Sequence, residues 1–173
     1  MRGAYRVRQF LMRLGVASRA IDHRAAREVL MGAAYALYAA MPPGDQVHAL
    51  GVLKTVRVAG SSLPELEQAA LLHDVGKAKS GLSFLHRTLV VLLGRFVPGS
   101  LERLARDTPG SWRYPFFVHL HHGEFGARRC EGAGCSPFVA ALVRYHEANT
   151  FPRDHDLLFQ EVLKALRRAD EQC

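Results

Sequence analysis

The sequence is poor in cysteine and has no long apolar run. Its three cysteines, Cys130, Cys135 and Cys173, are too few and odd in number for a disulfide framework, which predicts a reducing, cytoplasmic location. Cys130 and Cys135 resemble half of a zinc site, but no second cysteine pair completes it, so buried thiols are the favoured interpretation. The longest apolar run, 89–93, is far below the roughly 20 residues that span a bilayer and has the length of a core-helix segment.

Acidic residues are also scarce, with 16 against 23 basic residues and a net charge of +7. This balance favours anionic partners such as phosphates, nucleic acid or an acidic membrane surface. No basic motif of a known RNA-binding type is present, so no specific nucleic-acid partner is predicted. The basic segment 1–17 is expected to be an N-terminal arm that is frayed or packed, and peripheral membrane contact through it is the less favoured alternative.

The sequence has no convincing alternation of apolar and polar residues, and its apolar residues instead recur at helical spacing. Proline and glycine divide the chain into helical lengths. With 49% hydrophobic residues over 173 positions, the chain is long enough to bury one core. We therefore predict an all-α, single-domain helical bundle over 18–173, with seven or eight helices. The expected helices cover 18–40, 45–59 with Asp45 as its cap, 64–72, 82–97, 100–106, 116–131, 137–147 and 156–170.

Several histidines and acids lie within apolar helical faces or at the ends of helices. Burying such groups without partners costs several kcal/mol, and one metal ion can satisfy several of them at once. The strongest pair is His73-Asp74 at a predicted helix end, where Gly76 lets the chain turn sharply. Asp74 can bind one ion or bridge two ions about 3.5–4 Å apart. Imidazole and carboxylate ligands suit Fe, Mn, Co, Ni or Zn better than an all-oxygen Mg site.

The order of these residues resembles that of the HD-domain metal-dependent phosphohydrolases. That family has an isolated His, then His-Asp, then a distant Asp on a helical bundle, and many members add two further His and hold two metals. Here the resemblance covers about 45–171 and includes the segment Leu71-Leu72-His73-Asp74-Val75-Gly76-Lys77. It implies one or two divalent transition-metal ions (Mn, Fe, Co, Ni or Zn), held by His48, His73, Asp74, His122, His146 and Asp170.

The chain departs from some branches of this family. Some two-metal members have a His-His doublet where this chain has His146-Glu147, so one ion and two ions both remain open. The Gly-Tyr-Pro turn of the cyclic-dinucleotide phosphodiesterases is absent, which disfavours that substrate. The segment around His122, with Gly123 and Gly126, is somewhat similar to the branch that hydrolyses dinucleoside polyphosphates.

The resemblance implies hydrolysis of a phosphate ester or anhydride of a small molecule, with a nucleotide as the expected substrate, by a metal-activated water. Asp74 and Lys77 are the expected catalytic residues: Asp74 orients the water, and Lys77 holds a phosphate oxygen as a point charge. Arg57, Arg87 and Arg144 are candidates for contacts to distal phosphates, among which the sequence does not choose.

Two alternatives remain open at this point. The first is a non-catalytic module of the same fold that binds a metal or nucleotide in a regulatory role; the complete set of ligands argues against it. The second is an accessory protein that binds a membrane surface or nucleic acid through the arginines of segment 1–17.

Overall fold

The chain forms an all-α domain. The computed structural model describes residues 21–173 except 62, 79–80, 82, 98 and 149–155, and of Phe84, Arg87, Val91 and Arg95 it describes only the backbone. The predicted arm at 1–17 and loop at 149–154 therefore lie outside the described residues. Within them there are nine α-helices, one 3₁₀ turn and no strand, which confirms the predicted all-α class but exceeds the predicted seven or eight helices. The elements are α2 (Arg24–Val29), α3 (Gly32–Ala39), α4 (Pro43–Val58), α5 (Pro64–Leu72), η1 (Val75–Lys77), α6 (Phe84–Phe96), α7 (Ser100–Leu104), α8 (Tyr114–Gly132), α9 (Pro137–Tyr145) and α10 (Leu157–Gln172).

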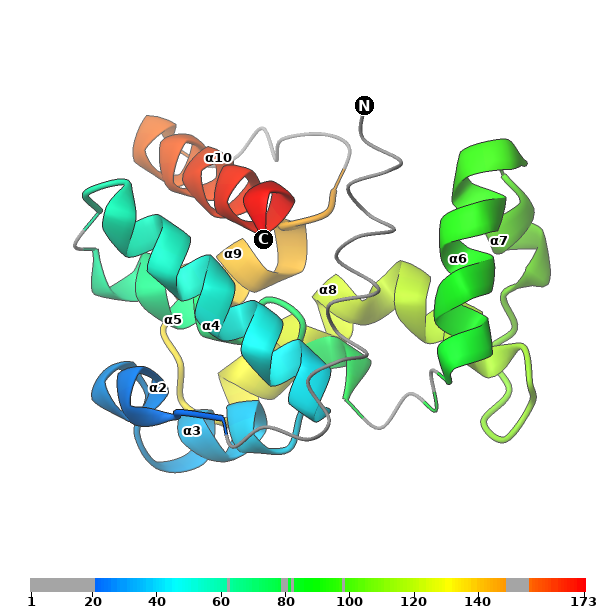
Figure 1. The fold of residues 1–173 in the computed structure, drawn as a ribbon, viewed down its shortest axis with the longest axis horizontal. Helices are drawn as coiled ribbons and strands as arrows, with labels where there is room; N and C mark the ends of the chain where they lie inside the picture. The colour runs from blue at the N-terminus through cyan, green and yellow to red at the C-terminus, as the bar shows by residue number, and fades with distance from the viewer. Residues whose placement is uncertain (1–20, 62, 79–80, 82, 98, 149–155) are drawn as a thin grey trace.

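Helix α5 is the centre of the domain. It packs against α2, α3, α4, α9 and α10, and α8 packs against both α9 and η1 (Figure 1). The helix begins at Pro64, where the fixed φ of proline favours a first turn, and it ends at Leu72 as predicted. Small residues at Ala69 and Ala70 are completely buried, which lets neighbouring helices approach closely. The residues that directly follow Leu72 therefore lie in the interior of the protein.

The predicted helix at 18–40 is wrong as a single element, because the chain breaks between α2 and α3. Leu30 and Met31 adopt extended backbone conformations, and Gly32 follows with a φ of +52°. The break places Leu30 in the core while Met31 stays 82% exposed. It also brings the His23 ring against Tyr38, with 3.1 Å between His23 Nδ1 and the Tyr38 hydroxyl. Tertiary packing of α2 and α3 therefore outweighs the local helical pattern.

The predicted cap of the next helix is also wrong. Helix α4 begins at Pro43, and Asp45 lies inside its first turn with 1% exposure. Proline at the first helical position is already set for the helix, so the helix starts two residues before Asp45. The side chain of Gln46 donates to the carbonyls of Ala39 and Met41 at 3.0 and 2.8 Å, which holds the link between α3 and α4.

Helix α6 is less buried than its apolar sequence predicts. It lies with α7 at one end of the molecule, beside the start of α8 (Figure 1). Leu85, Leu92 and Phe96, at positions i, i+7 and i+11, are 64%, 46% and 71% exposed. The interpretation of 89–93 as a core segment is therefore wrong, because no side chain described there is fully buried. No helix among the described residues is long and apolar enough to cross a membrane.

Three glycines allow backbones to approach closely beside the end of α5. A Cβ at Gly76 would overlap the carbonyl oxygen of His122 on α8. A Cβ at Gly123 would lie 2.6 Å from the carbonyl oxygen of Arg144 on α9, and one at Gly126 would lie 2.8 Å from Val143 Cγ1. Real Cβ atoms do not reach such separations, so these positions fix how closely η1, α8 and α9 pack.

This packing predicts that Gly76→Ala destabilises the protein, because the added methyl group meets backbone that cannot move independently. We expect a loss of about 2–3 kcal/mol, or about 4–12 °C in the melting temperature of a domain of this size. Gly132→Ala is the matched control, since a Cβ there meets no atom within 4 Å. Thermal unfolding followed by circular dichroism measures both variants. Equal melting temperatures for the two would contradict the proposed close packing.

Candidate metal centre

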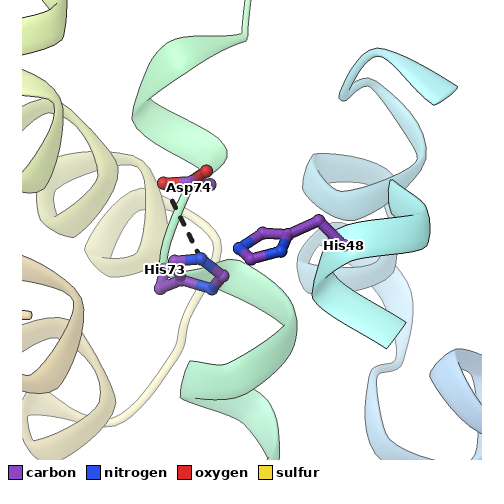
Figure 2. Close-up of side chains that lie close together, drawn as sticks. All are labelled: His48, His73 and Asp74. Atoms are coloured by element: carbon purple, nitrogen blue, oxygen red, sulfur yellow. Dashed lines mark ion pairs between the residues drawn. The ribbon is translucent and has the colours of Figure 1, made fainter. Parts of the chain in front are cut away.

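A first cluster of side chains joins α4, the end of α5 and α10. His48 on α4 points toward His73 and Asp74, which follow α5 directly (Figure 2). His73 Nε2 lies 3.7 Å from Asp74 Oδ1 and 3.6 Å from Asp170 Oδ1, and His48 Nε2 lies 2.8 Å from Asp170 Oδ1. The first cluster, defined as His48, His73, Asp74 and Asp170, therefore brings together four of the six predicted ligands.

A second cluster shares Asp74 with the first. It consists of Asp74, His122 on α8 and His146, which follows α9. His122 Nε2 and His146 Nε2 lie 3.5 and 3.7 Å from Asp74 Oδ1, and they lie 3.1 Å from each other. All three side chains are at most 3% exposed. The structure thus brings all six predicted ligands together around Asp74.

Backbone carbonyls fix the tautomers of the three histidines nearest Asp74. Each Nδ1–H donates to the carbonyl three residues earlier, at 3.0 Å for His73, 2.6 Å for His122 and 2.7 Å for His146. A carbonyl only accepts, so the proton of the neutral ring lies on Nδ1 and the Nε2 atom carries a lone pair. Three lone pairs therefore point toward the oxygen of Asp74, which is the arrangement that a metal ion requires of imidazole ligands.

The arrangement fits a divalent metal ion on two observations. His73 Nε2 is buried and has no hydrogen-bond partner within the described part of the chain. The Nε2 lone pairs of His122 and His146 face each other at 3.1 Å, which is repulsive unless a proton or a cation lies between them. Ligands held about 2.0–2.2 Å from one ion are about 3.0–3.5 Å apart, close to the separations seen here.

The electrostatics of the second cluster act differently on its two histidines. Burial, and after it the positive charge of Lys77, lower the pKa of His122 to about 3. Burial acts in the same direction on His146, but its hydrogen bond to Asp74 and the charge of Glu147 raise the pKa above its ordinary value. His146 therefore holds a proton more readily than His122 does. A metal ion bound by both Nε2 atoms would exclude a proton from the space between them.

The carboxylates of the centre are ionised. Burial opposes ionisation of Asp74, but Lys77 and the neighbouring imidazoles hold the pKa well below its ordinary range. Burial likewise opposes ionisation of Asp170, and its hydrogen bond with His48 lowers the pKa below the usual range. Both groups can thus serve as metal ligands at neutral pH without losing a proton first.

Lys77, predicted to hold a phosphate oxygen, lies inside the centre. Its Nζ is 2.7 Å from Asp74 Oδ1, and its side chain is 11% exposed. Arg57 forms ion pairs with Glu67 and Glu28 on the surface of α4. Because that charge is already neutralised, the structure gives no support to Arg57 as a phosphate-binding residue.

Arg144 is likewise bound to acids: it pairs with Glu124 at 2.7 Å and with Glu131 at 2.9 Å, and so links α9 to α8. The Arg87 side chain lies outside the described residues. Cys130 is fully buried, and burial raises its pKa, which disfavours the thiolate that zinc binds. Cys130 therefore fits the predicted buried thiol, whereas Cys135 is only partly buried.

An arginine that the sequence analysis did not single out ties η1 to α8. Arg129, two turns after His122, donates from Nη1 to the carbonyls of Val75 and Ala78 at 2.7 and 3.1 Å. These carbonyls flank η1, the turn that follows Asp74. The helix that carries one ligand therefore also holds the segment after another. In the sequence, the role of Arg129 was indicated only by its spacing of seven residues from His122, which places both on one face of α8.

A second arginine connects α10 to the end of α9 in the same way. Arg167, three residues before Asp170, donates to the carbonyls of Tyr145, His146 and Ala148 at 2.7, 3.0 and 2.8 Å. These carbonyls lie at and just after the C-terminal end of α9, where few backbone donors are available. Arg167 thus satisfies them and fixes the segment that contains His146.

Comparisons with known proteins found no match to a protein-family model, to a curated protein or to a solved structure.

The carbonyl contacts of Arg167 predict that Arg167→Met weakens metal binding as well as stability. The variant keeps most of the aliphatic stem but removes the donors, so we expect a loss of about 1–2 kcal/mol and a metal affinity lower by at least about tenfold. Calorimetric titration with Mn²⁺ and thermal unfolding measure the two effects. Arg168→Met is the control, because Arg168 is an exposed neighbour on the same helix. A metal affinity equal to that of the control would show that Arg167 does not position the ligands.

Proposed function

We propose that the protein is an HD-type, metal-dependent phosphohydrolase that cleaves a phosphate ester or anhydride of a small molecule. The observation that carries this proposal is the convergence of four histidines and one further aspartate, Asp170, around a single buried carboxylate, Asp74. The order of these residues in the sequence, and the helical bundle that brings them together, agree with the family that the sequence resembles. Nucleotides are the proposed substrate class.

The donor set suits the proposed chemistry. His48, His73, Asp74 and Asp170 would hold one ion, and Asp74, His122 and His146 would hold a second. A bound divalent metal supplies Lewis acidity, which lowers the pKa of water toward neutrality and offsets negative charge on phosphoryl oxygens. The protein fixes the tautomers and positions of its imidazoles beforehand, so little reorganisation is needed when substrate arrives.

Asp74 and Lys77 have the proposed roles closest to the reaction. Asp74 presents a second carboxylate oxygen besides Oδ1, so it can accept a hydrogen bond from the attacking water and orient it. Lys77 Nζ, only 2.7 Å from Asp74 Oδ1, lies where it can donate to a phosphoryl oxygen placed beside that carboxylate. An ammonium group acts as a compact point charge, so Lys77 can bind a single phosphoryl group.

This proposal predicts hydrolysis that depends on both metal and Asp74. The purified protein, incubated with Mn²⁺, Fe²⁺, Co²⁺, Ni²⁺ or Zn²⁺, is expected to release phosphate from a panel of phosphomonoesters, nucleotides and dinucleoside polyphosphates. Asp74→Asn keeps the shape but removes the charge shared by both clusters, so kcat is expected to fall by at least about a hundredfold. Lys77→Met is expected to raise KM and lower kcat together.

Glu161→Gln is the control, since Glu161 is an exposed residue of α10 that pairs with Lys164. It should leave kcat and KM unchanged. Absence of turnover with every metal, or full activity in Asp74→Asn, would contradict the proposed function. A nucleotide that raises the melting temperature of the metal-loaded protein without being hydrolysed would instead favour a regulatory binding module.

A further inference from the structure

Glu147 places a carboxylate beside the second cluster. It directly follows His146, and its Oε2 lies 3.6 Å from His122 Nε2. The other oxygen, Oε1, lies 3.9 Å from Lys77 Nζ. Three segments that are separate in the sequence therefore meet at this carboxylate: the end of α9, the middle of α8 and η1.

The position of Glu147 in the second cluster matches that of Asp170 in the first. Asp170 lies 3.6 Å from His73 Nε2, and Glu147 lies at the same distance from His122 Nε2. Each pair of imidazoles thus has one carboxylate of its own in addition to the shared Asp74. A separation of 3.6 Å is close to the roughly 3.0–3.5 Å expected between two ligands of one ion.

The backbone around Glu147 is held in place, although its side chain is 49% exposed. Arg167 donates to the carbonyls of His146 and Ala148, which lie immediately before and after this residue. Glu147 therefore starts from a fixed backbone position, and its partly exposed carboxylate lies beside His122. An ordinary surface glutamate has neither a backbone held by such hydrogen bonds nor a carboxylate beside a buried histidine.

We propose that Glu147 is a further protein ligand of the metal ion in the second cluster, giving each cluster two imidazoles and two carboxylates. This inference deepens the proposed function and rests on its metal-binding part. A second carboxylate makes the second cluster a harder ligand set, which favours Mn²⁺ relative to Zn²⁺. It also lowers the net charge that two divalent ions would otherwise create beside Lys77.

The competing explanation is that Glu147 only balances the charge of Lys77. The distances disfavour it, because Lys77 Nζ is 2.7 Å from Asp74 Oδ1 but 3.9 Å from Glu147 Oε1. Lys77 therefore already has a nearer carboxylate. The closer nitrogen to Glu147 is His122 Nε2, whose lone pair points into the cluster.

The test is metal binding by Glu147→Gln, measured without substrate. Equilibrium dialysis against Mn²⁺ and against Zn²⁺, followed by elemental analysis, gives the number of ions and their affinities. We expect two ions per wild-type chain. In Glu147→Gln one ion should bind at least about tenfold more weakly, with a larger loss for Mn²⁺ than for Zn²⁺. The electron paramagnetic resonance spectrum of neighbouring, coupled Mn²⁺ ions should change to that of isolated ions.

Glu131→Gln is the matched control, because Glu131 has the same 49% side-chain exposure and pairs with Arg144 outside the clusters. It should bind both ions as the wild type does. Thermal unfolding in chelator should give similar melting temperatures for Glu131→Gln and Glu147→Gln, which separates ligand loss from misfolding. In a Lys77→Met background, Glu147→Gln should still weaken one ion.

Two ions bound by Glu147→Gln with wild-type affinity would overturn the inference, as would a wild-type chain that binds fewer than two ions. An effect that disappears in the Lys77→Met background would also overturn it, since Glu147 would then be only a counter-ion. Failure of the proposed function would be distinguishable from failure of this inference. A wild type that binds two ions with the help of Glu147 but hydrolyses no phosphate compound would support Glu147 as a metal ligand and contradict the phosphohydrolase function.

Discussion

Neutral imidazoles whose lone pairs converge on one buried carboxylate oxygen are the arrangement on which the rest of the centre depends. Each ring is oriented by its own Nδ1–H bond to a carbonyl, so the Nε2 atoms of His73, His122 and His146 face Asp74 as acceptors. Such a grouping is costly to bury without a cation. The protein holds it in place because Asp74 follows the central helix α5, whose own packing forms the core.

The geometry of the centre also requires that the backbones of η1, α8 and α9 pack closely, which glycine allows at their contacts. Gly76 lies against the backbone of α8, while Gly123 and Gly126 on α8 lie against α9. A side chain at any of these positions would push α8 outward and carry His122 away from Asp74. Arg129 and Arg167 act at the edges of the same region, where they satisfy carbonyls at the ends of η1 and α9. Close packing and satisfied backbone groups thus set the geometry of the ligands together.

Local sequence signals predicted much of the fold and the positions of the ligands. Pro64 starts α5 as the sequence predicts, and Gly134, with a φ of +79°, lies just after the end of α8. Local patterns gave wrong helix boundaries where tertiary packing determines them. The break at Leu30 and Met31, for example, arises from contacts of α2 with the rest of the domain. The exposure of Leu92 could not be predicted either, because an apolar helix pattern does not specify which neighbours will cover it.

For the site, the order of histidines and aspartates predicted the six residues that meet, and the His73-Asp74 pair anchored that prediction. The sequence did not indicate how close His122 and His146 would come, since two helices must first pack through glycine. It also gave Glu147 no role, because only the turn after α9 directs that carboxylate toward His122. Residues that act through backbone contacts, such as Arg129, leave only a weak trace in the sequence.

The bond between His48 and Asp170 joins residues 122 positions apart, and it closes α10 onto α4. Closing so long a loop costs entropy, which must be recovered by contacts that exist only in the complete fold. If an ion binds between these two helices as proposed, it would be lost as soon as α10 detaches, even if the remaining helices persist. Metal supply would then govern how long the chain resists proteolysis, because cleavage begins from such opened forms.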